Sequence, residues 1–170
     1  PDITNAEQAV AFAKEFQIIL RYLGISDADM EKGQMRVEAN VSVRNEKLEN
    51  EKLGVKVEVK NINSFKAVHS AIDYEIKRQA EVLDKGEKII QETRGWDDAH
   101  NKTVSQRLKE EAHDYRYFPE PDLPPLDLNK FDLQQVKISI PELPQAKRQR
   151  FIKEYNLTPE QADLLVNDRY

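Results

Sequence analysis

Two runs of alternating apolar and polar residues constrain the fold of this chain more than any other feature. The first run extends from Met35 to Arg44 and the second from Val55 to Lys60. Successive side chains of a strand point to opposite faces, so this period of two predicts two strands, each with an apolar face and a polar face. The polar faces include Arg36, Glu38, Asn40, Ser42, Arg44, Glu58 and Lys60.

The register of the two strands follows from the same alternation. In an antiparallel hairpin, the apolar side chains of both strands lie on the same face only if the residue numbers of each opposing pair add up to an even value. The length of the charged loop at residues 45–52 then places Glu58 opposite Asn40 or Ser42. A slip by one residue would turn the charged side chains into the core.

Helical patterns and further strands complete the predicted fold. A capping pattern at Thr4 opens a helix that Gly24 ends, and a second helix begins at Asn63 or Ser64 and ends at Gly86. Strand-like segments occupy residues 88–94, 102–109 and 114–118. We therefore predict the α+β class, with a largely antiparallel sheet and helices that cover it.

A proline-rich connector and a change of period predict two domains. Residues 119–125 contain four prolines, which favour an extended connector over helix or central strand. From residue 139 the pattern is helical, and Thr158, Pro159 and Gln161 form a strong helix start. We place one domain at residues 1–138 and the start of a helical domain at residues 139–170. No glycine closes the last helical pattern before Tyr170, which predicts that the chain is a piece of a longer polypeptide.

Composition excludes several classes of function. The chain has no cysteine, which excludes disulfides and thiolate metal sites and favours the cytoplasm, and its three histidines show no metal-ligand spacing. No apolar run approaches the roughly 20 residues that span a bilayer, so we expect no membrane contact. The net charge of −5 restricts any nucleic-acid contact to local patches. Glycine-rich phosphate loops, catalytic triads and HExxH motifs are absent from the sequence.

Three groups of residues have both a structural and a functional interpretation. The polar strand faces are either a solvated surface or a site where carboxylates hold Mg²⁺ and basic side chains hold phosphate. Asn61, Asn63 and Ser64 are either ordinary helix caps or part of an anion site at a helix start. Between residues 103 and 122, Arg107 and Arg116 alternate with aromatic residues, which suits either nucleic-acid binding or a core with paired charges.

Six strings of the sequence carry a resemblance to a known family. They span residues 31–36, 39–44, 58–65, 71–79, 91–94 and 114–126, and the last string is the most specific. In content and order they resemble the B subunit of the tRNA-dependent amidotransferases, heterotrimers that also contain A and C subunits. The resemblance covers nearly all of the chain and places it in the second half of the family's catalytic cradle domain, which is similar in fold to glutamine synthetase.

The resemblance implies an ATP-dependent carbon–nitrogen ligase with glutamine as amide donor. In the family, the B subunit uses ATP and Mg²⁺ to phosphorylate the side-chain carboxylate of mischarged Glu-tRNA(Gln) or Asp-tRNA(Asn), and ammonia from the A subunit then forms the amide. Because the first half of the cradle supplies further metal-site residues in the family, we expect the chain alone to be inactive.

The resemblance also implies functional roles for individual residues of this sequence. The resemblance implies Glu58 and Glu38 as Mg²⁺ ligands, although the family usually has Asp at position 38. It implies that basic side chains contact phosphate or acyl-tRNA. It also implies that residues at the start of the second helix shape the nucleotide or tunnel region. The basic residues are Arg36, Lys60, Arg107 and Arg116, and the helix-start residues are Asn61, Asn63 and Ser64.

Two alternatives remain open from the sequence. The archaeal B-like subunit of the Glu-tRNA(Gln) amidotransferase shares several of the motifs. A second alternative is a non-catalytic module that docks the tRNA acceptor arm or the A subunit. The sequence does not discriminate between Glu-tRNA and Asp-tRNA as the substrate.

Overall fold

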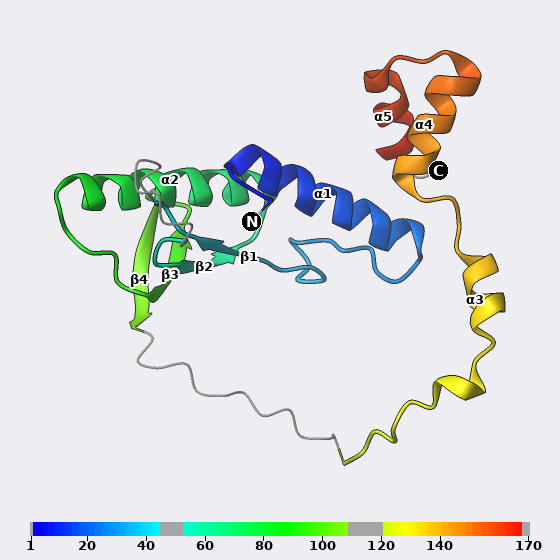
Figure 1. Ribbon diagram of the computed structural model, residues 1–170, viewed down its shortest axis with the longest axis horizontal. Coiled ribbons are helices and arrows are strands. Elements are labelled where there is room, and N and C mark those ends of the chain that lie inside the picture. The colour runs from blue at the N-terminus through cyan, green and yellow to red at the C-terminus, as the bar shows by residue number, and fades with distance from the viewer. Residues whose placement is uncertain (1, 45–52, 109–120, 168–170) are drawn as a thin grey trace. The chain divides into compact units, whose positions relative to one another are not determined.

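The computed structural model describes residues 2–44, 53–108 and 121–167. The chain divides into two compact units after Glu110 (Figure 1). The first unit contains helices and a four-stranded sheet, which confirms the predicted α+β class. No helix in the described part of the chain is long and apolar enough to cross a membrane.

The sheet of the first unit is mixed. Its strands lie in the order β1-β2-β3-β4, and both outer pairings are antiparallel, whereas β2 and β3 run parallel. The parallel pairing arises because α2 connects β2 to β3 as a crossover. The elements are α1 (Ala6–Tyr22), β1 (Val37–Val41), β2 (Val57–Ile62), α2 (Phe65–Asp84), β3 (Glu92–Asp97) and β4 (Lys102–Leu108).

The predicted hairpin register is confirmed. Asn40 lies opposite Glu58, and the apolar residues Val41 and Val57 form the next pair. β1 is shorter than the predicted strand, however, and its ladder is irregular between Val37 and Ala39. The polar side chains of both strands therefore share one face, as the alternation required.

The helix ends show how the sequence sets the element bounds. Asn5 caps α1, since its side chain accepts a hydrogen bond from the Gln8 backbone N–H at 2.8 Å. The prediction of Thr4 as the cap was wrong by one residue, because the Gln8 side chain returns to the Thr4 backbone N–H instead. Ser64 caps α2 as predicted, and Gly86 follows this helix at a φ of +74°, a conformation that favours glycine.

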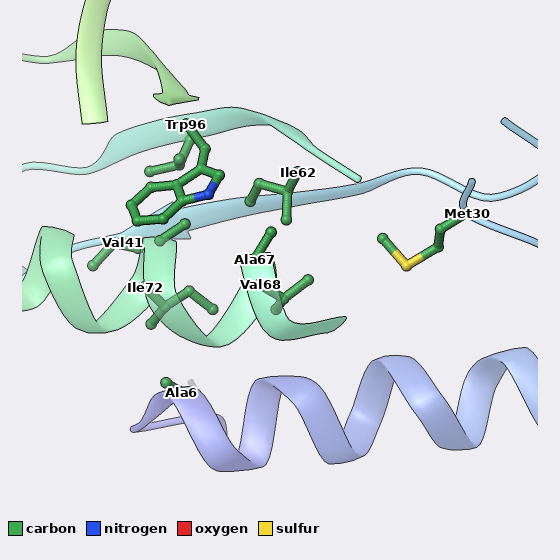
Figure 2. Packing of buried hydrophobic residues seen from close by; sticks show 10 residues of the cluster. Ala6, Met30, Val41, Ile62, Ala67, Val68, Ile72 and Trp96 are labelled. Atoms are coloured by element: carbon green, nitrogen blue, oxygen red, sulfur yellow. The ribbon is translucent and has the colours of Figure 1, made fainter. Parts of the chain in front are cut away.

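The apolar core lies between α2 and the sheet. Val59, Val68 and Ala71 have no exposed surface, and Trp96 is 4% exposed. Figure 2 shows α2 between the sheet and α1, with Val68 and Ile72 among the buried side chains. The first helix was expected to cover the sheet, but it packs mainly against α2. One face of the sheet is therefore packed against α2, and the polar side chains lie on the opposite face.

The described part of the second unit contains short helices. The capping pattern predicted at its last helix is confirmed, because the Thr158 and Gln161 side chains each bond the other residue's backbone N–H. Ala162 and Val166 of this helix are buried. The elements are η1 (Leu128–Lys130), α3 (Leu133–Ser139), α4 (Pro144–Tyr155) and α5 (Pro159–Asn167).

Candidate functional site

A charged cluster lies on the polar face of the sheet, and its four members come from three strands. The Lys60 Nζ lies 3.3 Å from Oε1 of Glu38 and 3.5 Å from Oε1 of Glu58. The Thr93 hydroxyl of β3 donates a hydrogen bond to Oε2 of Glu58 at 3.1 Å. We call Glu38, Glu58, Lys60 and Thr93 the polar-face cluster. Two carboxylates thus share one cation, and one of them is also oriented by a hydroxyl.

A bulge in β2 directly follows Lys60. Val59 pairs with Ala39, and Ile62 pairs with Val37. Between these two pairs β2 advances by three residues, whereas β1 advances by only two. The additional residue is accommodated at Asn61, which has a φ of +61° and donates its side-chain N–H to the Trp96 carbonyl at 3.2 Å. Bulges of this kind change the direction of side chains and recur next to active sites.

The electrostatics of the cluster are those of two carboxylates that hold one ammonium between them. The hydrogen bond to Glu38 and the charge of Glu58 raise the pKa of Lys60, so its ammonium persists at neutral pH. The Glu58 side chain is 16% exposed, while those of Glu38 and Lys60 are 46% and 41% exposed. Glu38 is therefore open to a cation from solvent, whereas Glu58 is mostly covered.

The cluster fits Mg²⁺ as a partial ligand set. Carboxylate oxygens are the ligands that Mg²⁺ prefers, and Mg²⁺ usually binds one or two carboxylates together with water and substrate phosphates. Glu38 and Glu58 can supply these two. Among the described residues, no group of three or more carboxylate, histidine or cysteine side chains is placed to hold a metal ion. Further ligands would have to come from water, phosphate or residues outside the described part.

The other predicted site residues have different positions. Arg36 is exposed directly before β1, and Asn63 is exposed before α2. The Ser64 hydroxyl accepts the Ala67 backbone N–H at 3.0 Å, so it serves as a helix cap. The Cα of Arg107 pairs with that of Thr93, which is itself paired with Glu58, but the Arg107 side chain lies outside the described part. Arg116 also lies outside it.

A buried polar network lies on the opposite face of the sheet, centred on Glu75 of α2. This carboxylate has no exposed surface, and it accepts hydrogen bonds from Arg78 twice and from Gln79 and Thr103 once each, at 2.6–3.0 Å. The four bonds use the full accepting capacity of a carboxylate. Arg94 adds an ion pair at 3.7 Å.

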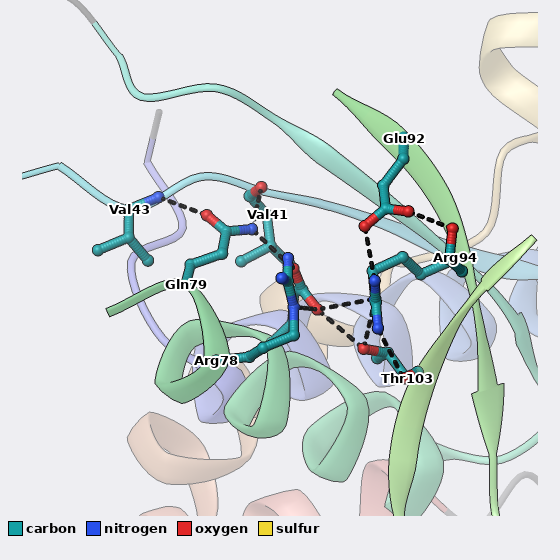
Figure 3. A network of polar contacts seen from close by, with 9 residues as sticks. Val41, Val43, Arg78, Gln79, Glu92, Arg94 and Thr103 are labelled. Carbon is teal, nitrogen blue, oxygen red and sulfur yellow. Dashed lines mark hydrogen bonds and ion pairs between the residues drawn. The ribbon is translucent and has the colours of Figure 1, made fainter. Parts of the chain in front are cut away.

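The network reaches both edge strands, β1 through Gln79 and β4 through Thr103 (Figure 3). The Gln79 carboxamide donates to the Val41 carbonyl at 3.1 Å and accepts from the Val43 N–H at 3.0 Å, as a neighbouring strand would. Arg94 donates to Glu92 at 2.6 Å and to the Thr103 hydroxyl at 2.8 Å. β1, β3 and β4 are therefore all bonded to side chains of the same network.

Sequence reasoning missed Thr93 and this network. Thr93 is a single hydroxyl in a strand, which gives no periodic signal. A signal for the network did exist, because Glu75 and Gln79 continue the helical spacing of Val68 and Ile72 along the buried stripe of α2. Polar residues in such a stripe indicate buried partners, since an unpaired buried charge is very costly.

The pH dependence of stability can be predicted from Glu92. Burial raises the pKa of this carboxyl, but hydrogen bonds from Ser105 and Arg94 outweigh burial and lower the pKa below the ordinary 4.5. Its contribution to stability is complete above pH 4.5 and is lost as the pH falls through the lowered folded-state value. We expect Glu92→Gln to flatten the acid limb of a plot of unfolding free energy against pH. An unchanged acid limb would contradict this assignment.

Comparison with known proteins identifies the family. Residues 1–134 match the model of the GatB/GatE catalytic domain, so most of the chain is covered by this match. The chain belongs to the GatB/GatE catalytic domain family. This membership agrees with the resemblance that the six sequence strings carry.

Curated relatives share about half of their aligned residues with this chain. Proteins named as the B subunit of aspartyl/glutamyl-tRNA(Asn/Gln) amidotransferase are similar to it at 49% identity in Carboxydothermus hydrogenoformans and 51% in Persephonella marina. The protein of the same name in Thermodesulfovibrio yellowstonii is 49% identical. Each alignment covers 99% of this chain but only 35% of the relative, so the chain spans about a third of the length of these relatives.

Proposed function

We propose that this chain forms part of the nucleotide and Mg²⁺ site in the B subunit of an amidotransferase for mischarged tRNA. The observation that carries the proposal is the polar-face cluster, in which Glu38 and Glu58 hold one ammonium between them on an accessible sheet face. The names of the relatives support the substrate class, Glu-tRNA(Gln) or Asp-tRNA(Asn), and a multi-subunit assembly. The proposal includes the A and C subunits as partners and the cytoplasm as the compartment.

The proposed reaction has two steps, both at the substrate's side-chain carboxyl group. An oxygen of that carboxylate attacks the γ-phosphorus of ATP, the new O–P bond forms, and the bond to the β-phosphate oxygen breaks to release ADP. Ammonia from glutamine then attacks the acyl carbon, a C–N bond forms, and phosphate leaves. Bound Mg²⁺ would neutralise phosphate charge during the first step.

The proposed role of each residue follows from its charge. Glu58 and Glu38 would hold the cation, with Thr93 orienting Glu58. Lys60 would stabilise the oxygens of the phosphoryl group, because its raised pKa keeps it a cation and makes it unsuited as a general base. In the same proposal, Arg36, Arg107 and Arg116 contact phosphate or acyl-tRNA. Asn61, Asn63 and Ser64 shape the nucleotide region.

The proposal also covers the architecture. A glutamine-synthetase-like cradle half at residues 1–138, followed by the start of a helical domain at residues 139–170, is supported by the α+β unit and by the family match, which ends at residue 134. The polar working face of the sheet is consistent with such a cradle. We expect the chain by itself to lack ligase activity, because the polar-face cluster supplies two carboxylates and no group of three or more described ligands could hold a metal ion.

The decisive experiment is Glu58→Gln in the full-length protein within the assembled complex. We expect Mg²⁺-ATP binding, measured by calorimetry, to weaken by at least about 100-fold, because even residues behind metal ligands often change metal affinity 10–100-fold. Amide formation on Glu-tRNA should fall in parallel. Glu81→Gln is the matched control, since Glu81 is exposed on α2 and the charge change is the same.

The same experiment tests the alternative of a docking module. Unchanged nucleotide binding and activity in an intact Glu58→Gln complex would contradict the catalytic proposal. Loss of tRNA binding, or of assembly with the A subunit, in other surface variants would then favour docking. For the archaeal B-like alternative, the matched family model includes both kinds of protein. The names of the similar relatives favour the B subunit.

A further inference from the structure

The polar-face cluster and the Glu75 network lie on opposite faces of the same strands. β3 makes the connection, because its residues alternate between the two faces. Glu92 and Arg94 bond to the network, whereas Thr93 between them donates to Glu58 on the other face. The orientation of Thr93 is thus set by the two residues on either side of it.

Thr93 also lies at an irregular point of the sheet. The register of β3 and β4 shifts between Thr93 and Arg94, since Thr93 pairs with Arg107 and Arg94 pairs with Ser105. One residue of β4, Gln106, is left without a partner in this ladder. A strand with such a bulge can twist locally, so the direction of Thr93 needs support from outside the ladder.

The buried network supplies that support from helix α2. The Arg94 guanidinium bonds both the hydroxyl and the carbonyl of Thr103, at 2.8 and 2.9 Å, and the same hydroxyl donates to Glu75 at 3.0 Å. Gln79 joins Glu75 to β1, the strand that carries Glu38. Glu75 therefore fixes both strands that flank β2, and β2 carries Glu58.

We propose that Glu75 is a positioning residue for the cation site, acting through Arg94 and Thr93 on the Glu58 carboxylate. Glu75 does not contact the bound cation or the substrate in this proposal. The inference rests on the proposed function, since it takes Glu58 as the cation ligand. It adds a chain of residues that extends from a buried helix position to the reacting face of the sheet.

The test measures cation binding directly, with Mn²⁺ as a paramagnetic probe and the full-length protein in its complex. We expect Thr93→Val to weaken Mn²⁺ binding by about 10-fold, in the range typical of residues that orient metal ligands. Thr93→Ser keeps the hydroxyl and should restore the affinity to within about twofold of the original. A structural loss alone would not be rescued by the smaller side chain, because serine lacks the methyl group that packs in the sheet.

Glu75→Gln should weaken Mn²⁺ binding to a similar extent at temperatures where the variant remains folded. Thr103→Val is a second variant, because it removes the hydroxyl that joins Glu75 to Arg94 with little change of shape. Asp73→Asn is the matched control: Asp73 is on the same helix and forms an exposed ion pair with Lys77 at 2.8 Å. Its Mn²⁺ affinity should be unchanged.

A double-mutant cycle decides whether Glu75 acts through Thr93. If it does, Glu75→Gln added to Thr93→Val should cause little further loss of Mn²⁺ affinity, since coupled residues are not additive. Additive losses, or unchanged binding in Thr93→Val, would overturn the inference. Because Glu58→Gln is measured in the same assay, a loss there with no effect at Thr93 refutes only the positioning role. No loss in Glu58→Gln refutes the proposed function itself.

Discussion

Replacing Glu75 by leucine should lower the free energy of unfolding by about 3 kcal/mol, because removal of one partner from a buried ion pair leaves an uncompensated charge. The Arg94 side chain is 14% exposed and would lose Glu75, and Gln79 would lose an acceptor in a fully buried position. The expected loss lies at the low end of the usual range, since Arg78 is 22% exposed and can turn toward water.

Urea denaturation of the chain measures this loss. The sequence has one tryptophan, Trp96, which lies in the core beside α2 and can report the transition by its fluorescence. Asp73→Leu is the control, because it removes a carboxylate from an exposed pair on the same helix, where we expect a change within about 0.5 kcal/mol. Equal losses for the two variants would show that the Glu75 network does not stabilise the fold.

The second large effect should come from Trp96→Ala, with a loss of about 3–5 kcal/mol. Trp96 is 4% exposed, and its ring packs edge-to-face on Tyr74 with the ring centres 6.3 Å apart. Its indole N–H donates to Asp98 at 3.0 Å. The truncation leaves a cavity between α2 and the sheet that the surrounding backbone can fill only in part.

Circular dichroism is the suitable probe for this variant, since the fluorescent side chain is removed. Val104→Ala in the neighbouring strand provides the comparison, because Val104 is 44% exposed and its truncation should change stability by less than about 0.5 kcal/mol. A loss of less than about 1 kcal/mol for Trp96→Ala, on the order of a surface effect, would contradict the burial of Trp96 in the core.

The register of the hairpin formed by β1 and β2 could be predicted, because it follows from a periodic pattern in two neighbouring segments of the sequence. Strict alternation leaves few registers open, and the loop length reduces them to two, of which the structure has the pairing of Glu58 with Asn40. The length of β1 was overestimated for a physical reason. Beyond Val41 the backbone bonds to the Gln79 carboxamide, and this bond comes from a helix distant in sequence.

The parallel pairing of β2 with β3 could not be predicted from the sequence. The residue pattern of a strand does not depend on the direction in which the strand runs. The connection through α2 and residues 85–91 is also long enough to join β2 to either a parallel or an antiparallel β3. Of the candidate site, Glu38, Glu58 and Lys60 could be predicted because they share the alternating face, and the structure brings them together. The roles assigned to them, and to Arg107 and Arg116, remain predictions.

Because α2 is the crossover between β2 and β3, its number of residues determines how its side chains align with the sheet. The sheet consists of two hairpins, β1-β2 and β3-β4, and the parallel pairing joins them side by side. Glu58 belongs to the first hairpin and Thr93 to the second, so the bond between them forms only when the hairpins dock. A single residue inserted into α2 before Glu75 would turn the following side chains by about 100° and move Glu75 and Gln79 out of line with the sheet. Length changes in this family should therefore accumulate outside α2, for example at residues 85–91, while the number of residues in α2 stays constant.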